Sequence, residues 1–322
     1  MKDLFEIAVG SVTGTDHTKI YKNNQDAYAY KVGDNYIVAS VADGCSAGAY
    51  SEFGARFAVN YFVNAVSNIL QSLSRNDIDS LSLNEHISFP FFEKVRLDMI
   101  SSIRVLANSM GTDFNKVIND FFLFTMVCVV VTPFGTDIVS IGDGYFALNK
   151  EEFDIDIPES QDSSLQNAPP YIAYNLVNSK LYEKDCKSLK FCLLNSVQTT
   201  LIDTILIASD GVSNWKSIES EFIPGKQDLI GPLSQFWSDD KYFTNPDMLR
   251  RKLYLINNPK IKLDKEQNTI NKYPGYLNDD TSILVIRRKK HKTYAWIPSR
   301  TPEREAHLNC SPFLLSKRKD SG

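Results

Sequence analysis

The sequence lacks the marks of a secreted or membrane-spanning protein. Its first residues, MKDLFEIAVG, contain neither the basic start nor the long apolar segment of a signal peptide. No run approaches the roughly 20 apolar residues that a transmembrane helix requires, and the longest candidate, residues 121–131, has the length of a strand. We therefore expect a cytoplasmic protein without a membrane partner.

Cysteine and histidine are scarce and scattered. The five cysteines are an odd number without the paired spacing of zinc sites, and Cys128 lies inside an apolar run. The four histidines do not form a cluster either. This pattern favours reduced thiols in a cytosolic protein and gives no support for a zinc site.

Strong charge of either sign is also absent. The net charge of −4 gives no electrostatic basis for binding nucleic acid. Hydrophobic residues make up 43% of the chain and charged residues 23%, which is ordinary for a soluble globular protein. With 322 residues and no internal repeat, the chain has room for one large domain or two small ones.

The sequence does contain an apolar strand that ends in a carboxylate. Residues 36–42 form an apolar, partly β-branched run that predicts a buried strand, and Asp43-Gly44 ends it. Ser51 is expected to cap a helix, because apolar residues then recur at spacings of three and four up to Leu70. Asp-Gly is a common turn pair, but a carboxylate on such a rigid element is also well placed to bind a metal.

A second aspartate is expected beside the first. Asp26 precedes the alternating strand AYAYKV, and Asp34-Asn35 is the expected hairpin turn between this strand and the next. Antiparallel pairing of the two strands would place Asp26 and Asp43 at the same end of the sheet.

Three more aspartates adjoin apolar strands. Asp210 follows the run LIDTILIAS, and Asp279 precedes the run SILVI. Asp143 stands in Gly142-Asp143-Gly144 between two strands, where Asp-Gly is also the preferred hairpin turn. For Asp143, a turn and a functional role therefore both remain open.

The rest of the chain contributes helices, loops and a tail. A second helical pattern starts at about residue 91 and ends near Gly111. Residues 14–24 and 260–276 are polar and predict loops, and the acidic segment 151–166 predicts an exposed excursion. The basic tail, residues 289–322, is expected to be partly disordered or docked.

The carboxylates share one arrangement that points to metal binding. Several carboxylates converging on one site repel each other unless divalent cations neutralise them. Ligation by carboxylate and carbonyl oxygens alone selects hard ions such as Mg²⁺ or Mn²⁺ over zinc or copper. Sites of this kind commonly serve phosphate chemistry.

The order of the motifs resembles that of the metal-dependent type 2C protein phosphatases, the PPM class, and in particular their bacterial branch. The motifs are NQDAYAY, VADGCSAGAYSEFGARFAV, IVSIGDGYFAL, ILIASDGV and DDTSILVI, and the resemblance spans residues 5–288. It implies an α+β fold of two antiparallel β-sheets packed as a sandwich, with helix pairs on both outer faces. It also implies a catalytic domain over residues 1–288, followed by the tail at 289–322.

The resemblance implies metal-binding roles for the aspartates. Asp43 would bridge two Mn²⁺ or Mg²⁺ ions, and the Gly44 carbonyl would complete one coordination sphere. Asp210 and Asp279 would hold the first ion. Asp279 is preferred to Asp280 because DDTS aligns with the family's Asp-Asn-x-Ser/Thr, although a slip by one residue stays open.

Two further ligands follow from the same resemblance. Asp26 would support the second ion, directly or through its waters, and Asp143 lies where bacterial members bind a third, weaker ion. Many relatives have Glu-Asp where this chain has Gln25-Asp26, so ligation of the second ion is expected to rely more on water.

The implied activity is the hydrolysis of phosphoserine and phosphothreonine in proteins. A hydroxide bridging the two ions would be the nucleophile, and a cognate Ser/Thr kinase would make the substrate. The alternatives are a pseudophosphatase that binds phosphoproteins or a partner, and a structural protein whose aspartates merely end strands. A pseudophosphatase should have lost one of Asp43, Asp210 and Asp279, and this chain has all three.

Two family positions differ here. Eukaryotic members often carry a histidine, a candidate general acid, where this chain has Cys45. The family's phosphate-binding arginine is replaced by Tyr21, and Lys19, Lys22 or His17 are the possible substitutes. For either lysine taken alone, a solvated loop charge is the favoured interpretation, and His17 is expected to be a loop residue rather than an acid.

Overall fold

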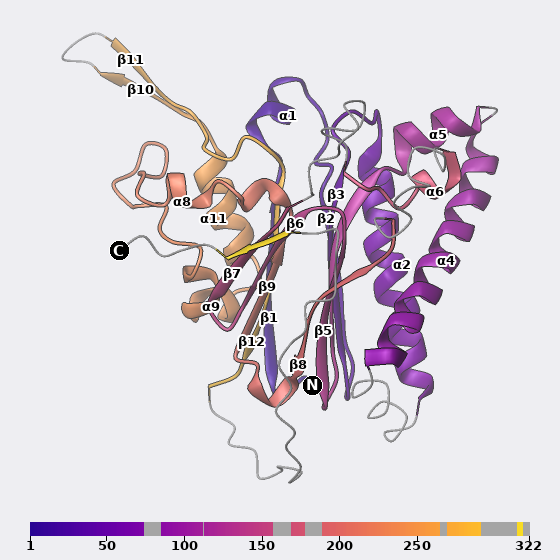
Figure 1. Cartoon of the computed structure of the whole chain (residues 1–322). Coiled ribbons are helices and arrows are strands. Elements are labelled where there is room, and N and C mark those ends of the chain that lie inside the picture. Colours follow the sequence, from indigo (N-terminus) through magenta and orange to yellow (C-terminus); the bar gives the residue numbers. More distant parts are fainter. Residues whose placement is uncertain are drawn as a thin grey trace.

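We describe a computed structural model of the chain (Figure 1). The residues described are 1–73, 85–111, 113–156, 169–177, 189–264, 269–290 and 314–317. Within these residues, no helix is both long and apolar enough to cross a lipid bilayer.

Two antiparallel sheets stand face to face in the middle of the molecule (Figure 1). One has the strand order β2-β3-β4-β5-β8, and the other has the order β1-β12-β9-β6-β7-β13. The five-stranded sheet contains β2 (Ala27–Val32), β3 (Ile37–Gly44), β4 (Phe124–Val131), β5 (Gly135–Ile141) and β8 (Cys192–Gln198). The six-stranded sheet contains β1 (Phe5–Val12), β12 (Thr281–Arg288), β9 (Thr204–Ala208), β6 (Gly144–Leu148), β7 (Glu151–Asp156) and β13 (Leu314–Lys317).

The central strands read as continuous apolar runs because both of their faces are buried. Side chains alternate across a strand, so one strand contributes to two cores. In β3, Ile37, Ala39 and Val41 pack into the core between the sheets. Val38 and Ala42, on the opposite face, pack into the core beneath the helices.

Helices cover the outer face of each sheet (Figure 1). The five-stranded sheet is covered by α2 (Ser51–Ser72) and α4 (Glu85–Met110), with α5 (Phe114–Phe121) and α6 (Tyr174–Val177) near one end. The six-stranded sheet is covered by α11 (Met248–Asn257) together with α8 (Trp215–Ile218), α9 (Gln235–Ser238) and α10 (Lys241–Thr244). The predicted sandwich with helices on both outer faces is therefore confirmed.

Several local expectations were wrong. The second helix begins at Glu85 rather than near residue 91, and the polar segment 14–24 contains a short helix, α1 (Thr15–Lys19). The segment 260–276 contains a hairpin of two strands, β10 (Lys260–Asp264) and β11 (Thr269–Tyr273). Short or polar elements such as these give too few apolar repeats to stand out in a sequence.

Two more corrections concern the segment 151–166 and a cysteine. The predicted excursion begins with a paired strand, β7, while most of its remainder lies outside the described residues. Cys192 is disulfide-bonded, contrary to the expectation of reduced thiols, whereas Cys45 and Cys128 are free. The partner of Cys192 lies outside the described part of the chain.

Part of the C-terminal tail extends the six-stranded sheet. Strand β13 pairs antiparallel with β7, and Leu315 stands opposite Ile155. This pairing fits the expectation of a docked tail for residues 314–317. The boundary at residue 288 between a catalytic domain and a tail stays a prediction.

The core beneath α2 yields a test of stability. Phe62 is fully buried and stacks on Phe92 of α4, with ring centroids 6.3 Å apart. Replacing Phe62 by Ala should lower the free energy of unfolding by about 3–5 kcal/mol, because a large cavity remains. The exposed Val105 of α4 is the control, and Val105→Ala should stay within about 0.5 kcal/mol. Equal urea midpoints for the two variants would contradict this assignment of the core.

Candidate metal centre

The register of β2 and β3 brings the first two aspartates together. Ala27 pairs with Ala42, so Asp26 and Asp43 face each other at the next position of the ladder. This confirms the expected placement of both carboxylates at one end of the sheet. Gly44 must be a glycine, because a Cβ there would lie 2.8–2.9 Å from the backbone oxygens of Ser51 and Gln25.

The second sheet brings Asp210 and Asp279 to the same end. Strands β9 and β12 are antiparallel, with Ala208 opposite Ile283. The residues that follow β9 therefore lie beside the residues that precede β12. Asp210 begins the 3₁₀ turn after β9, and Asp279 lies two residues before β12. The Ser209 amide donates to the Ser282 carbonyl at 3.1 Å and fixes this pairing.

Asp143 joins the two sheets rather than closing a hairpin. It connects β5 of one sheet to β6 of the other, and Gly142 and Gly144 on either side have φ of 78° and 145°. Such angles favour glycine. The turn interpretation of this Asp-Gly pair is therefore wrong, because β5 and β6 do not pair with each other.

The carboxylates interact strongly. Burial raises the pKa of Asp43 well above its usual range, and the charges of Asp26, Asp210, Asp279 and Asp143 raise it further. The other four aspartates therefore lie within electrostatic reach of Asp43. Every carboxylate named from the sequence is thus near Asp43, although among the described residues the only group of three or more whose potential ligand atoms all lie within 4.8 Å of one another consists of His17, Asp279 and Asp280.

The same causes act on the neighbours of Asp43. Burial, followed by the charges of Asp143 and Asp279, raises the pKa of Asp210 to about 7, although a hydrogen bond with the Asp43 side chain opposes the shift. Burial also raises the pKa of Asp143 to about 6. The metal-free site therefore retains protons that ordinary aspartates would lose.

The orphaned oxygens of the site fit a divalent cation. Asp26 Oδ2 accepts a hydrogen bond from the Ser209 hydroxyl at 2.6 Å, but Asp26 Oδ1 and Asp210 Oδ1 are buried without a hydrogen-bond partner among the described residues. A buried carboxylate oxygen left without a partner is costly. An oxygen-rich, carboxylate-only donor set suits Mg²⁺ or Mn²⁺.

Both carboxylate oxygens of Asp280 are engaged by backbone amides, so Asp280 is not free to bind a metal. Its side chain is 1% exposed. Its two carboxylate oxygens accept from the amides of Gly14 at 2.6 Å and Gln25 at 2.5 Å. Asp279 is exposed, and its Oδ1 accepts only from the Asp280 amide, at 2.8 Å. This geometry supports the preference for Asp279 as the ligand.

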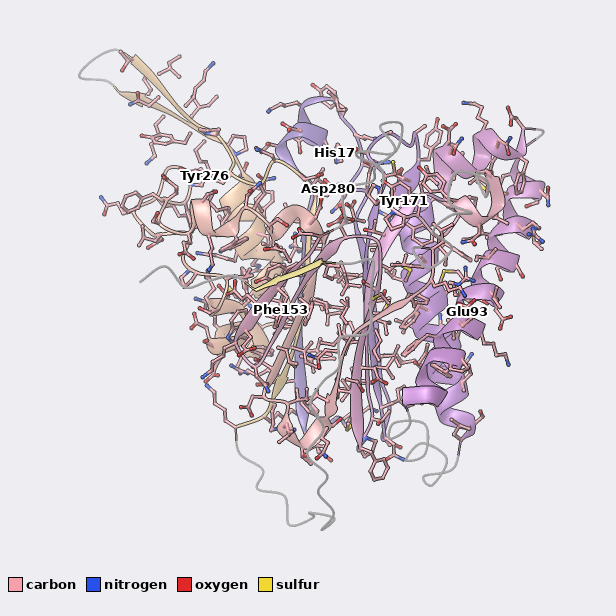
Figure 2. All side chains as sticks on the ribbon, in the orientation of Figure 1. His17, Glu93, Phe153, Tyr171, Tyr276 and Asp280 are labelled. Atoms are coloured by element: carbon pink, nitrogen blue, oxygen red, sulfur yellow. The ribbon has the colours of Figure 1, made fainter. Side chains whose placement is uncertain are left out.

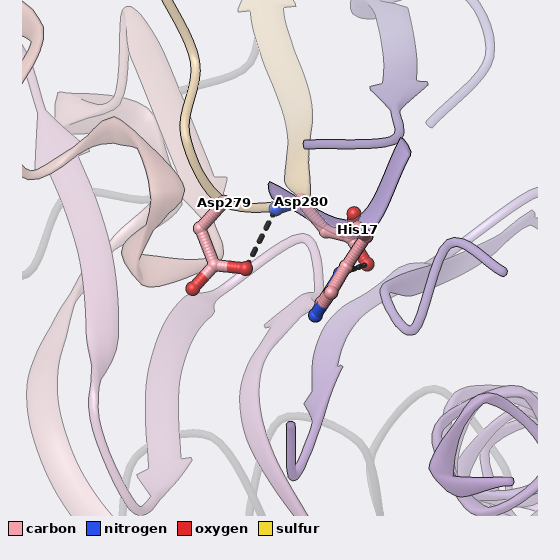
Figure 3. Close-up of side chains that lie close together, drawn as sticks. All are labelled: His17, Asp279 and Asp280. Carbon is pink, nitrogen blue, oxygen red and sulfur yellow. Dashed lines mark hydrogen bonds and ion pairs between the residues drawn. The ribbon is translucent and has the colours of Figure 1, made fainter. Parts of the chain in front are cut away.

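His17 lies beside Asp280. It belongs to α1 and is buried, with Nδ1 2.9 Å from an Asp280 carboxylate oxygen (Figure 3). The oxygen lies off the N–H direction, so this is an electrostatic contact rather than a hydrogen bond. Atoms of His17, Asp279 and Asp280 come within 4.8 Å of one another. His17 is therefore a buried helical residue, not the loop residue expected.

The two lysines named as phosphate-binding substitutes differ in their contacts. Lys19 forms an exposed ion pair with Asp16 at 2.8 Å. The Lys22 ammonium donates to the Ser46 carbonyl, in the segment that follows Asp43-Gly44. Tyr21 is 96% exposed and does not fill the place of a buried cation. The assignment of a phosphate-binding cation stays a prediction.

Gln25 braces the segment that follows Asp43-Gly44. Its side-chain amide donates to the Ser51 hydroxyl, and Ser51 in turn donates to the Cys45 carbonyl at 2.8 Å. Ser51 is the first residue of α2 rather than its cap, which is Tyr50. The side chain that replaces the family's glutamate thus supports the loop.

Tyr171 lies near these carboxylates, although no motif in the sequence singles it out (Figure 2). It is buried, and its pKa is raised above the usual range by burial, by a hydrogen bond and charge interaction with Cys45, and by the charges of Asp43 and Asp143. It comes from a segment with mixed strand and loop signals. Only the apolar run Tyr171–Ala173 after two prolines hints at its burial.

Comparison with known proteins identifies the family. The family model for protein phosphatase 2C matches residues 13–241, and the chain belongs to this family. Among solved structures, it is similar to a bacterial serine phosphatase carrying a point substitution, with TM-score 0.50, 11% identity and coverage of 90% of this chain and 100% of that one. No curated protein matches the chain.

Two other solved structures are similar. Serine/threonine phosphatase Stp1 from Staphylococcus aureus has TM-score 0.48 and 12% identity, with 88% of this chain and 94% of that one covered. The catalytic domain of the phosphatase PstP in complex with two manganese ions has TM-score 0.41 and 13% identity, with 88% and 98% covered.

The neighbouring Asp279 and Asp280 allow a matched test. Asp279→Asn should lower Mn²⁺ affinity in titration calorimetry at least tenfold and leave the metal-free protein at least as stable, because repulsion falls. Asp280→Asn should lower the free energy of unfolding by about 1–3 kcal/mol, because a buried amide loses its acceptor. If Asp280→Asn instead lost the metal at full stability, the ligand would be Asp280.

The raised pKa values predict how the metal-free protein responds to pH. Asp210 has its pKa raised from 3.8 to about 7, so the stability it contributes is present at low pH and is lost as pH rises through 7. The free energy of unfolding should therefore fall between about pH 4 and pH 7, by an amount on the order of a few kcal/mol, and the thermal midpoint should fall with it. Asp210→Asn should flatten the fall, and Mn²⁺ should reverse it at pH 8. A midpoint that is constant over this range would contradict the electrostatic account.

Proposed function

We propose that this chain hydrolyses phosphoserine and phosphothreonine in proteins, using two Mn²⁺ or Mg²⁺ ions. The observation that carries the proposal is the meeting of buried, partnerless carboxylate oxygens from both sheets at one end of a protein phosphatase 2C fold. None of the carboxylates that the family's chemistry requires is missing. A phosphorylated protein and the kinase that makes it are the partners this function implies.

Each residue has a proposed task. Asp43 would bridge the two ions with help from the Gly44 carbonyl, Asp210 and Asp279 would hold the first ion, and Asp26 the second. Two ions so held would activate water and stabilise the attacking and leaving oxygens of an in-line displacement.

The surrounding residues set the geometry of this centre. Ser209 orients the Asp26 carboxylate through its hydroxyl, at 2.6 Å. Asp280 holds the amides of Gly14 and Gln25, and thereby the loop that carries Lys22. Asp143 would support a third ion. We assign no general acid, because Cys45 occupies the position of the family's candidate histidine.

The activity test compares p-nitrophenyl phosphate with a phosphothreonine peptide, each with Mn²⁺, with Mg²⁺ and with a chelator. Turnover should require metal, and Asp43→Asn or Asp210→Asn should lower kcat/KM at least about 100-fold, because the ions are lost. The control is Asp137→Asn. Asp137 is also a buried aspartate, with its pKa raised by burial to about 6, but it bonds to Ser196 away from the site.

The outcomes separate the alternatives. Asp137→Asn should keep its activity. If the loss of any buried carboxylate impaired the enzyme, all three variants would lose activity alike. A folded, metal-loaded protein that is silent on both substrates would instead indicate a pseudophosphatase. Activity that survives both the chelator and Asp210→Asn would show that the site lies elsewhere.

A further inference from the structure

The hairpin of β10 and β11 stands away from the body of the molecule (Figure 1). Its strands pair only with each other within the described part of the chain, with Leu263 opposite Ile270. An isolated two-stranded hairpin is only marginally stable in water. The hairpin also lies outside residues 13–241, the part that matches the family.

One face of this hairpin exposes apolar side chains. Ile261, Leu263 and Ile270 are 70%, 59% and 62% exposed. Side chains alternate along a strand, and the register pairs Leu263 with Ile270 and Ile261 with Lys272, so all four lie on one face. We call these four residues the arm face. Apolar side chains gathered on a projecting element mark an interaction site more often than scattered ones do.

The other face of the hairpin turns toward the body. A Cβ added at Gly225 would lie 3.2 Å from side-chain atoms of both Lys260 and Lys262. These two lysines therefore point toward the turn between Phe222 and Leu229, which pair in an isolated bridge. The arm face is directed away from that turn and is free for a partner.

The hairpin carries positive charge in an acidic protein. The chain has a net charge of −4, yet Lys260, Lys262 and Lys272 form no ion pair with any residue in the described ranges. Lys262 lies instead over the Tyr273 ring, 5.8 Å from its centroid. Charges left without partners on an apolar element favour an anionic partner.

The base of the hairpin is bonded to the segment that leads into α1. The Asn257 side-chain oxygen accepts a hydrogen bond from the Leu277 amide at 3.0 Å. Its side-chain nitrogen donates to the Thr13 carbonyl at 2.7 Å. The Thr15 amide, at the start of α1, donates to the Leu277 carbonyl at 2.9 Å. Five residues separate Tyr273 from Asp279, which limits their Cα separation to about 20 Å.

From these observations we propose that the arm face docks an extended segment of the phosphoprotein substrate that carries acidic and apolar residues. Apolar side chains of the segment contact Ile261, Leu263 and Ile270, and its acidic side chains pair with Lys272, the cation of the arm face. The proposal rests on the proposed function, because it explains how a phosphorylated residue elsewhere in that substrate reaches the carboxylates.

The charges argue for this occupant over a second copy of the chain. A second hairpin docked through its own arm face would bring a second Lys272 toward the first, and like charges repel. A phosphoprotein segment is anionic and extended, so it can cover the apolar side chains and neutralise Lys272 together. Anionic membrane lipid, which shares the charge but not the peptide, is an outcome that the test distinguishes.

The binding test uses metal-free protein, so that no phosphatase activity is needed. The probe is a fluorescein-labelled phosphothreonine peptide that is extended by eight alternating Glu and Leu residues. Its binding is measured by fluorescence anisotropy. A second peptide replaces each Glu by Lys. We expect the Ile261→Ser/Ile270→Ser double variant to bind the Glu-Leu peptide at least tenfold more weakly, and the Lys-Leu peptide to bind wild type at least tenfold more weakly.

Val105→Ser is the matched control, because Val105 is 68% exposed on α4. It should bind the Glu-Leu peptide like wild type, and all variants should keep the wild-type thermal midpoint. Equal peptide binding by wild type and the double variant would overturn the proposal. Hairpin-dependent sedimentation with phosphatidylserine vesicles, or hairpin-dependent self-association in ultracentrifugation, without peptide binding would also overturn it.

Activity of the metal-loaded enzyme separates this proposal from the proposed function. The double variant should lose at least tenfold in kcat/KM with the Glu-Leu peptide and keep its rate with p-nitrophenyl phosphate. If wild type hydrolyses neither substrate while hairpin-dependent binding persists, the phosphatase assignment fails and peptide capture stands. If both substrates are hydrolysed and the double variant handles them like wild type, the docking proposal fails alone.

Discussion

Both sheets place carboxylates at one end of the sandwich, and the rest of the structure has to offset the repulsion among them. The charges of four other aspartates raise the pKa of Asp43, and its burial keeps water from screening those charges. Such an arrangement is unfavourable for the metal-free fold, so it persists only where the surrounding packing over-determines it. The two cores behind β3, one against the other sheet and one against α2, provide that packing.

Asp280 shows how the fold separates structural from chemical carboxylates. Two adjacent aspartates have the same chemistry, but one is buried with its oxygens on the Gly14 and Gln25 amides, while the other is exposed. The buried one ties the N-terminal loop to the start of β12. The exposed one accepts a single backbone hydrogen bond, from the Asp280 amide to its Oδ1. Local position, rather than residue type, thus decides which carboxylate is free.

The sequence could predict what depends on local pattern and on strand pairing. The positions of Asp26 and Asp43 followed from an alternating strand, a turn and a buried strand, and the register confirmed them. The crossing of Asp143 between sheets could not be predicted, because its Gly-Asp-Gly context is identical to that of a hairpin. Tyr171 could not be predicted, because tertiary packing brings it to the site, and such packing leaves no periodic pattern in the local sequence.

The ligand set itself could be named from the sequence only through resemblance to a family. Asp279 and Asp280 are indistinguishable by composition and neighbours, and the family alignment alone favoured the first. What the structure adds is a physical ground for that choice in the bonds that Asp280 makes. The exposed hairpin could not be predicted either. Its alternating Lys and apolar residues are too few to stand out from the polar sequence around them.

The pairing of β1 with β12 has a consequence for biosynthesis. Phe5 stands opposite Arg288, so the opening strand can pair only after all the strands that lie between β1 and β12 in the sequence have been synthesised. Contacts of such long range are slow to form. The opening strand, with its apolar side chains, must remain unpaired until then. The order of synthesis therefore leaves the six-stranded sheet without its first strand until β12 is available to pair with it.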